Sequence, residues 1–190
     1  VFLIPQKWTF SWLEPRKRVL RHCMKNSERI YTYKLPFGLW LLVLTDSERL
    51  TRTWLQDVEP AIGEVSRGIL KDFLDKYSAG LWEPTPVLNS IDWSDYTEKR
   101  GEVYRTLSAT IPMGSTITYG HLGAICGCTP RAVGVYMRTN KFPIIIPCHR
   151  VVGQKSLGGY SPEVKWKKVI LEWELNNAKS NRSNGTFWSW

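Results

Sequence analysis

Cys148, His149 and Arg150 form the run of side chains in this sequence that could carry out covalent chemistry. A cysteine attacks as its thiolate, which a neighbouring base or positive charge favours. Adjacent residues of an extended strand point to opposite faces. His149 would therefore have to reach the thiol across a turn or through a water molecule. On spacing alone, Cys148 is either a nucleophile or a buried structural thiol.

A histidine that acts as a base is commonly oriented by an acidic side chain. The carboxyl-terminal half offers five candidates, which are Glu98, Glu102, Glu163, Glu172 and Glu174. Their spacing from His149 does not choose among them.

Positive charge is concentrated in the second half of the chain. The net charge is +9, and residues 96–190 carry 13 Lys or Arg against 5 Asp or Glu, whereas residues 1–95 carry 13 against 12. No acidic residue occurs between Val103 and Pro162. This distribution suits an anionic partner such as a nucleic acid, because each neutralised phosphate releases counterions. A solvated basic face would explain the charge equally well.

Composition narrows the class of protein. Hydrophobic residues make up 43% and charged residues 23%, as in ordinary globular proteins. No apolar run approaches the roughly 20 residues of a membrane span, and Val1–Pro5 is too short for a signal-peptide core. We therefore expect an intracellular protein without membrane contacts, cytoplasmic or, in a eukaryote, nuclear. Four cysteines do not make a disulfide scaffold. His22 and Cys23 lack partners at metal-ligand spacing, so no metal site is expected.

The first half of the chain predicts a small sheet followed by a helix. Residues 29–34, 39–44 and 50–55 have strand patterns, and a turn at 36–38 makes the first two antiparallel. A helix is expected over 63–77, and the apolar residues of its inward face are Val65, Ile69, Phe73 and Tyr77. The Pro-containing stretch 83–89 resembles a linker. We therefore expect domains at 1–90 and 91–176, with a mobile tail over 177–190.

The second half predicts helices around a helix-turn-helix. A helix is expected over 95–110, and Thr118 and Thr129 can cap the two that follow. Gly127 lies in the turn between them. The second of these, over 130–139, places four residues on one face, namely Arg131, Gly134, Val135 and Arg138. Any pair of packed helices can give this pattern, but the basic charge favours DNA binding.

Two further elements flank the Cys-His-Arg run. Residues 142–147 are apolar and bracketed by prolines, which predicts a rigid, strand-like segment that delivers Cys148. A last helix is expected over 162–176. Its apolar positions are Val164, Ile170, Leu171 and Leu175.

The sequence resembles the O6-alkylguanine-DNA alkyltransferases through several motifs in the same order. Pro147-Cys148-His149-Arg150-Val151-Val152 is similar to the active-site signature of that family. The other matching motifs are Thr118-Tyr119-Gly120, Pro130-Arg131-Ala132-Val133-Gly134, Met137-Arg138-Thr139-Asn140 and Leu157-Gly158-Gly159-Tyr160-Ser161. The match runs from about residue 97 to 175. The amino-terminal half fits only in outline.

This resemblance implies a mixed α/β (α+β) fold and a reaction. A small sheet-and-helix domain of ribonuclease H-like type would precede a mostly helical domain with the helix-turn-helix. The protein would flip an alkylated guanine, and potentially an O4-alkylthymine, out of double-stranded DNA. It would transfer the alkyl group irreversibly to Cys148, acting as a monomer without a cofactor or metal. The second helix would lie in the minor groove, where small residues fit.

The resemblance also assigns roles to residues. His149 would act as the base through a water molecule and Glu174 would orient it, with Glu172 as the competitor. Asn140 would brace the turn at the active site. Tyr119 would push a DNA phosphate and protonate guanine, and Arg131 would fill the space the base leaves. The substrate pocket would be formed by Met137, Val151, Gly158, Tyr160 and Ser161.

The chain departs from the family pattern on the second helix. Val135 and Tyr136 stand where members commonly carry Gly or Ala, and Tyr136 could instead point into the core. Cys126 and Cys128 have no counterpart in the family, and the zinc ligands of animal members are not evident. Three alternative functions remain for this chain. It could be a non-reactive binder of alkyl damage, a non-catalytic helix-turn-helix regulator or a cysteine hydrolase. The binders replace the acceptor cysteine, whereas this chain retains it.

Overall fold

A four-stranded sheet forms the first half of the chain in the computed structural model, which describes residues 27–61, 63–161 and 163–178. Its strands are β1 (Glu28–Lys34), β2 (Trp40–Asp46), β3 (Arg49–Gln56) and β4 (Glu64–Val65). Their order is β3-β2-β1-β4, with β1 to β3 antiparallel and β4 parallel to β1. The three strands predicted from sequence are confirmed. The expected turn contains Gly38, whose φ of 86° few other residues adopt.

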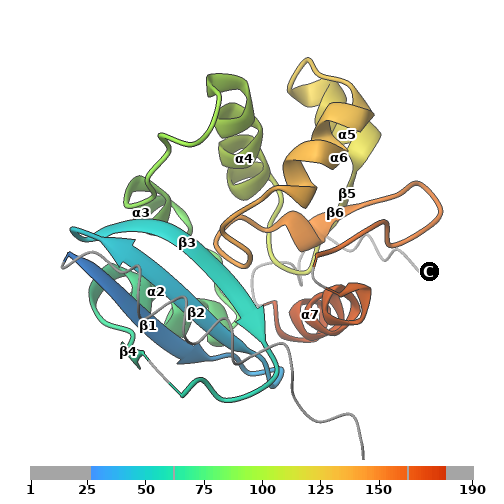
Figure 1. The fold of residues 1–190 in the computed structure, drawn as a ribbon. Helices are drawn as coiled ribbons and strands as arrows, with labels where there is room; N and C mark the ends of the chain where they lie inside the picture. Colours follow the sequence, from blue (N-terminus) through green and yellow to red (C-terminus); the bar gives the residue numbers. More distant parts are fainter. Residues whose placement is uncertain (1–26, 62, 162, 179–190) are drawn as a thin grey trace, which may run out of the picture.

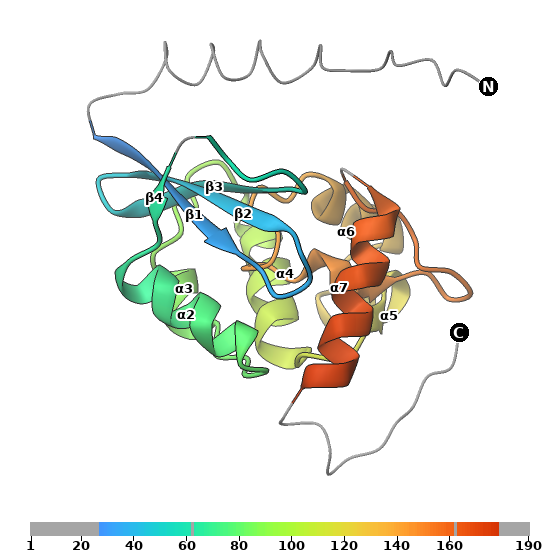
Figure 2. The same cartoon turned by 90° about the horizontal axis from the view of Figure 1, so that it is seen from below.

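Two helices follow the sheet, and α2 covers one of its faces (Figures 1 and 2). The helix predicted over 63–77 is α2 (Gly68–Ser78), because its first residues instead form β4. Val65 and Ile69 are exposed, so the predicted inward face was wrong at these two positions. The buried face consists of Leu70, Phe73, Leu74 and Tyr77. The expected linker contains a helix, α3 (Thr85–Asn89), whose Val87 is fully buried.

The second half contains four more helices and a short parallel strand pair. The helices are α4 (Glu98–Thr110), α5 (Tyr119–Ile125), α6 (Pro130–Arg138) and α7 (Val164–Asn177). The strands are β5 (Ile117–Thr118) and β6 (Val151–Val152). The side chains of Thr118 and Thr129 accept the capping hydrogen bonds of α5 and α6, as predicted. A helix-turn-helix is therefore present, with Gly127 at a φ of 61° in its turn.

The mixed fold with a small sheet and helices is confirmed, but the core does not divide at residue 90. One continuous cluster of buried residues includes Leu41 and Tyr77 from the first half and Val103 and Ile145 from the second. The proposed domain limits at 1–90, 91–176 and 177–190 stay predictions. Asn177 ends α7 and Ala178 is buried. The rest of the expected tail, Val1–Pro5 and the His22–Cys23 pair lie outside the described residues.

The segment before Cys148 differs from the prediction. Residues 142–147 form a tight turn closed by a bridge between Pro143 and Ile146, not a strand. Ile144 lies at a φ of +74°, which a β-branched residue rarely adopts. In the last helix, Ile170 and Leu171 are buried as expected, whereas Val164 and Leu175 are exposed.

Candidate active site

The turn over 142–147 presents Cys148 at the start of a single 3-10 turn, η1 (Cys148–Arg150). Asn140 holds this turn at both ends. Its Nδ2 donates to the Ile146 carbonyl at 3.1 Å, and its Oδ1 accepts from the Phe142 amide at 2.9 Å. These bonds and complete burial hold Ile144 in a conformation that costs about 1–3 kcal/mol. The bracing contacts expected of Asn140 are therefore present.

Cys148 lies in the wall of a cavity of about 280 Å³ and is itself 7% exposed. Met137, Tyr160 and Ser161, three of the five residues that the resemblance assigns to a substrate pocket, line the same cavity. Val151 is buried in β6 and does not line it. A small molecule in this cavity would therefore lie next to Cys148.

His149 and Glu174 form a buried pair behind Cys148. Nε2 of His149 lies 2.9 Å from Oε1 of Glu174, and both side chains are 0% exposed. Glu172, the competing acid, is exposed and lies 3.7 Å from Lys168. Nδ1 of His149 is buried and has no hydrogen-bond partner among the residues described. The geometry thus selects Glu174 as the acid that contacts His149.

Arg150 is fully buried and belongs to the same cluster of buried side chains. Its Nε donates to Oε2 of Glu174 at 2.9 Å, and its Nη2 donates to Oε1 at 2.8 Å. Its guanidinium also lies 3.8 Å from the ring centre of Trp82, and the hydroxyl of Tyr77 donates to Oε1 at 2.9 Å. The sequence suggested that Arg150 would favour the thiolate. Its charge is instead matched by Glu174.

These surroundings determine the charge states of the cluster. Burial opposes ionisation of Glu174, but Arg150 and His149 outweigh it and hold the pKa of the carboxyl well below its usual value. Burial lowers the pKa of His149, against the opposing effect of Glu174. His149 is therefore neutral near pH 7. Since Glu174 is ionised, Nε2 of His149 must carry the hydrogen, which leaves Nδ1 as an acceptor.

Cys148 is a neutral thiol at rest. Burial raises the pKa of Cys148, although a hydrogen bond from the Asn140 side chain and the charge of Lys167 oppose that rise. Attack by its sulfur therefore requires removal of a proton, and the acceptor nitrogen of His149 is the nearest base in the chain sequence.

Lys167 is a buried cation that holds the loop next to the cavity in place. Its Nζ donates to the carbonyl of Val151 at 2.6 Å and to that of Gly159 at 3.2 Å. It thereby ties the loop that carries Tyr160 to the strand after η1. Burial lowers the pKa of Lys167 to about 8. The buried hydroxyl of Tyr160 has no protein partner among the described residues.

Tyr119 begins α5 and packs against the same loop. A Cβ atom added to Gly158, whose φ is +68°, would lie 2.9 Å from the Tyr119 hydroxyl oxygen. Parallel pairing of Thr118 with Val152 brings α5 beside the strand that follows η1. Burial raises the pKa of Tyr119, so its hydroxyl stays protonated. Gly158 therefore provides room for Tyr119 rather than a surface of the cavity.

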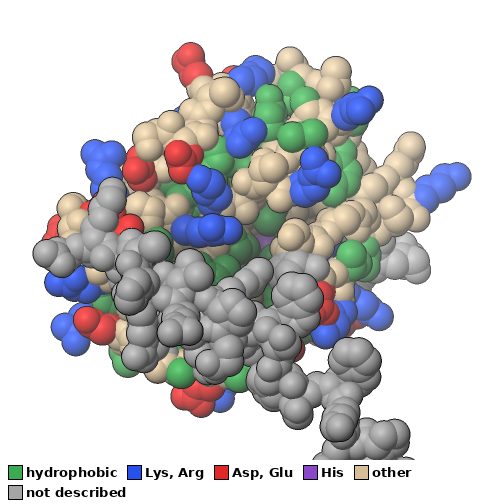
Figure 3. All heavy atoms as spheres, in the orientation of Figure 1, with side chains coloured by type: hydrophobic (Ala, Val, Ile, Leu, Met, Phe, Trp, Pro, Cys, Tyr) green, Lys and Arg blue, Asp and Glu red, His purple; other side chains and the backbone are tan. Residues whose placement is uncertain are grey.

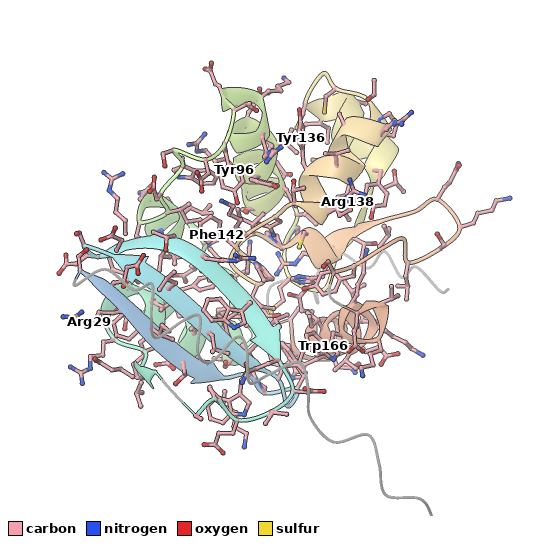
Figure 4. All side chains as sticks on the ribbon, viewed as in Figure 1. Arg29, Tyr96, Tyr136, Arg138, Phe142 and Trp166 are labelled. Atoms are coloured by element: carbon pink, nitrogen blue, oxygen red, sulfur yellow. The ribbon has the colours of Figure 1, made fainter. Side chains whose placement is uncertain are left out.

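The outer face of α6 is exposed, as the sequence predicted. Val133 and Met137 are buried, whereas Arg131, Val135 and Arg138 point outward. A Cβ atom at Gly134 would meet nothing within 4 Å. Figure 3 shows Lys and Arg side chains around the hollowed centre of this face of the molecule, and Figure 4 labels Arg138 on α6.

Tyr136 packs partly into the core, as the alternative reading of its position suggested. It lies under the guanidinium of Arg100, 5.3 Å from the ring centre. The second departure from the family pattern, Val135, is 39% exposed on the outer face. Cys126 and Cys128 are both free thiols in the turn before α6.

Four further residues at this site have no signal in the sequence. Tyr77 and Trp82 come from the first half and contact Glu174 and Arg150, while Lys167 is a buried cation on α7. Arg52 reaches the cavity of Cys148 from β3. The contacts of Tyr77, Trp82 and Arg52 join segments far apart in the chain, so only the tertiary arrangement identifies them.

Metal binding and membrane insertion are two other classes of function that a structure can indicate. Within residues 27–61, 63–161 and 163–178, no three His, Cys, Asp or Glu side chains are grouped so that they could hold a metal ion. None of the helices described combines the length and apolar character needed to cross a membrane.

Comparison with known protein families gives a match to the second half of the chain. The matching family profile is described as "6-O-methylguanine DNA methyltransferase, DNA binding domain" and covers residues 98–176. A methylated-DNA–protein-cysteine methyltransferase of Metallosphaera sedula is 33% identical over 152 residues, which are 77% of this chain and 92% of that protein. The protein of the same name from Thermococcus sibiricus is 38% identical over 87 residues, 46% of this chain. That match spans about half of the Thermococcus protein, 50%.

Solved structures of similar proteins extend the likeness to the first half. The O6-methylguanine-DNA methyltransferase of Pyrococcus kodakaraensis superposes with a TM-score of 0.65 at 26% identity, covering 76% of this chain and 98% of that one. The OGT protein of Mycobacterium tuberculosis, crystallised in complex with DNA, gives a TM-score of 0.58 at 30% identity. That alignment covers 78% of this chain and 94% of the other.

Proposed function

Because this chain belongs to the methylated-DNA–protein-cysteine methyltransferase family, we propose that it repairs O6-alkylguanine in DNA by transferring the alkyl group to Cys148. The observation that carries the proposal is the buried His149–Glu174 pair, whose histidine follows in the chain a cysteine that lines a cavity. In this setting His149 can take the proton of the thiol, and the adjoining cavity can hold a nucleobase of DNA.

The reaction begins with proton removal. His149 takes the proton of Cys148 on Nδ1, through a water molecule, while Glu174 accepts the hydrogen of Nε2 and stabilises the resulting cation. Lys167 favours the thiolate electrostatically. The sulfur then attacks the alkyl carbon, forming a carbon–sulfur bond as the bond from that carbon to guanine O6 breaks.

The electron pair of the broken bond moves onto guanine. Tyr119, whose hydroxyl stays protonated, donates a proton to guanine N3 as the base leaves. The product is guanine and an S-alkylated Cys148. Since the carbon–sulfur bond of a thioether resists hydrolysis and the Cys148 thiolate is a poor leaving group, the protein is consumed, and one chain repairs one lesion.

The DNA partner is double-stranded. A base inside the stack cannot reach a thiol in a cavity, so the damaged nucleotide must rotate out of the helix. Arg131 would then fill the vacated space, and α6 would lie in the minor groove with Gly134 closest to its floor. Val135 and Arg138 would flank this contact. We propose that a monomer acts where the cell keeps its DNA, the cytoplasm or the nucleus.

The edge of the flipped guanine would be recognised inside the cavity. The backbone around Cys148 and Val151, together with Ser161, would supply its hydrogen bonds, while Met137 and Tyr160 would pack against its ring. Of these five residues, Val151 is the one that does not itself line the cavity.

The deciding experiment is intact-mass measurement after incubation with excess O6-benzylguanine. We expect one benzyl group per chain and no further increase with time, and no increase for Cys148→Ala. A protein that binds alkylated DNA without gaining mass would instead be a non-reactive damage binder. More than one turnover per chain would exclude the single-use mechanism.

A further inference from the structure

Cations line the cavity of Cys148 from both halves of the chain. Arg138 and Lys141 belong to the basic second half, whereas Arg52 lies on β3 of the amino-terminal sheet. Lys141 is paired with Asp95. Neither arginine forms an ion pair with a carboxylate in the part of the chain described, and no Asp or Glu lines the cavity. Two guanidinium groups that have no carboxylate partner among the described residues therefore border it.

The backbone beside Arg52 is fixed against the turn that carries Cys148. The amide of Thr53 donates to the Lys141 carbonyl at 2.7 Å, and its hydroxyl donates to the Pro143 carbonyl at 3.1 Å. Thr53 is 2% exposed. These two bonds keep β3 next to the active-site turn, so the presence of Arg52 at the cavity is a consequence of the fold rather than of a long side chain bending across a surface.

Exposure increases from the bottom of the cavity to its mouth. Cys148 and Met137 are 7% and 8% exposed, whereas Arg52, Arg138 and Ser161 are exposed residues. A nucleotide that enters base-first keeps its phosphates at the mouth, because a phosphate must stay solvated or paired. The planar fork of an arginine matches two phosphate oxygens.

We propose that Arg52 binds a backbone phosphate next to the flipped nucleotide, so that the DNA-binding surface extends from α6 onto the amino-terminal sheet. This inference rests on the proposed function. It adds to the DNA-binding residues expected from the sequence, all of which lie in the basic second half of the chain. Arg52 would act from the side of the cavity opposite α6 and hold the strand while the base is inside.

The test is the salt dependence of DNA binding. Affinity for a duplex that carries one O6-methylguanine is measured by fluorescence anisotropy at several salt concentrations, in Cys148→Ala chains so that no transfer occurs. Arg52→Ala should weaken binding and reduce the slope of log K against log salt by about one, as expected for one lost phosphate contact. Arg52→Lys should retain most of that slope. The matched control is Arg49→Ala, an exposed arginine of the same strand that does not line the cavity.

The outcomes separate this inference from the proposed function. Equal slopes for Arg52→Ala and Arg49→Ala would overturn the phosphate contact. With Cys148 intact, Arg52→Ala should slow reaction with the duplex more than reaction with free O6-benzylguanine, which has no phosphate. An equal loss on both substrates would mean that Arg52 acts on the base, also against the proposal. If the wild-type chain is alkylated by neither substrate, the proposed function fails. The slopes of log K against log salt still decide whether Arg52 contacts DNA.

Discussion

Nε2 of His149 and Oε1 of Glu174 lie 2.9 Å apart in a region that solvent does not reach. The same carboxylate accepts two hydrogen bonds from Arg150 and one from Tyr77. One acidic side chain therefore orients the proposed base and also balances a buried cation. Removing its charge should affect reaction and folding together.

Glu174→Gln should lower the free energy of unfolding by about 3–5 kcal/mol, because it leaves Arg150 buried without its counter-charge. It should also slow alkyl transfer, since an amide stabilises the protonated form of His149 less well. Urea unfolding and the rate of adduct formation measure the two effects. The control is Glu172→Gln, an exposed position on the same helix, where a change within about 0.5 kcal/mol is expected. Similar losses for both variants would contradict the assignment of Glu174.

Gly158→Ala should destabilise the protein by about 1–3 kcal/mol, because alanine rarely adopts a φ of +68°. Its methyl group would also press on the ring of Tyr119, so reaction with alkylated DNA should slow. Gly159→Ala is the matched control, since a Cβ there meets nothing within 4 Å. Urea unfolding and single-turnover rates on duplex DNA provide the comparison. If both alanine variants behave alike, the contact between residue 158 and Tyr119 has no importance.

Stability should fall as the pH is lowered from 7 to 4. The folded state lowers the pKa of His149 below the ordinary 6.5, so the unfolded chain binds the extra proton first and acid favours unfolding. The depressed pKa of Glu174 adds a second loss below its ordinary value of 4.5. Urea unfolding at pH 7, 5.5 and 4 measures the trend. In His149→Gln the decrease between pH 6.5 and 5 should shrink, and an unchanged pH profile would show that His149 does not contribute.

Arg131→Ala should slow repair of O6-methylguanine in duplex DNA, with a loss on the order of tenfold. Unstacking a base costs a few kcal/mol, and the side chain that fills the vacated space recovers part of this. Free O6-benzylguanine needs no such filling, so its reaction should change less. Single-turnover rates on both substrates give the ratio, with Arg67→Ala, an exposed arginine of the first half, as the control. If Arg131→Ala and Arg67→Ala give the same ratio of duplex rate to free-base rate, Arg131 has no role in base flipping.

Much of the fold could be predicted from local patterns. The strands β1 to β3 have clear alternation or apolar runs, and the caps of α5 and α6 are threonines with the expected hydrogen bonds. The failures arise where tertiary packing overrides a local pattern. Residues 142–147 have the apolar, β-branched composition of a strand, but burial on all sides and the bonds of Asn140 fold them into a turn.

The candidate site was predictable only in part. Motif resemblance identified Cys148, His149, Asn140 and Glu174, whose contacts the structure contains. Spacing from His149 alone did not distinguish Glu174 from Glu172, and only the resemblance to the family favoured Glu174. Tyr77 is 97 positions away from the carboxylate it contacts, so no local pattern could have indicated it.

The hydrogen bond from Tyr77 to Glu174 has a consequence for how the two halves can be exchanged. A chimera that combined residues 91–178 with the first half of another relative would lose this hydroxyl, unless the donor supplied a tyrosine at the same place. The Arg150 guanidinium would likewise lose the Trp82 ring it lies against. We therefore expect the rate of alkyl transfer in such hybrids to be higher when both aromatic residues are present. The first half would then have to match the catalytic half with which it is combined.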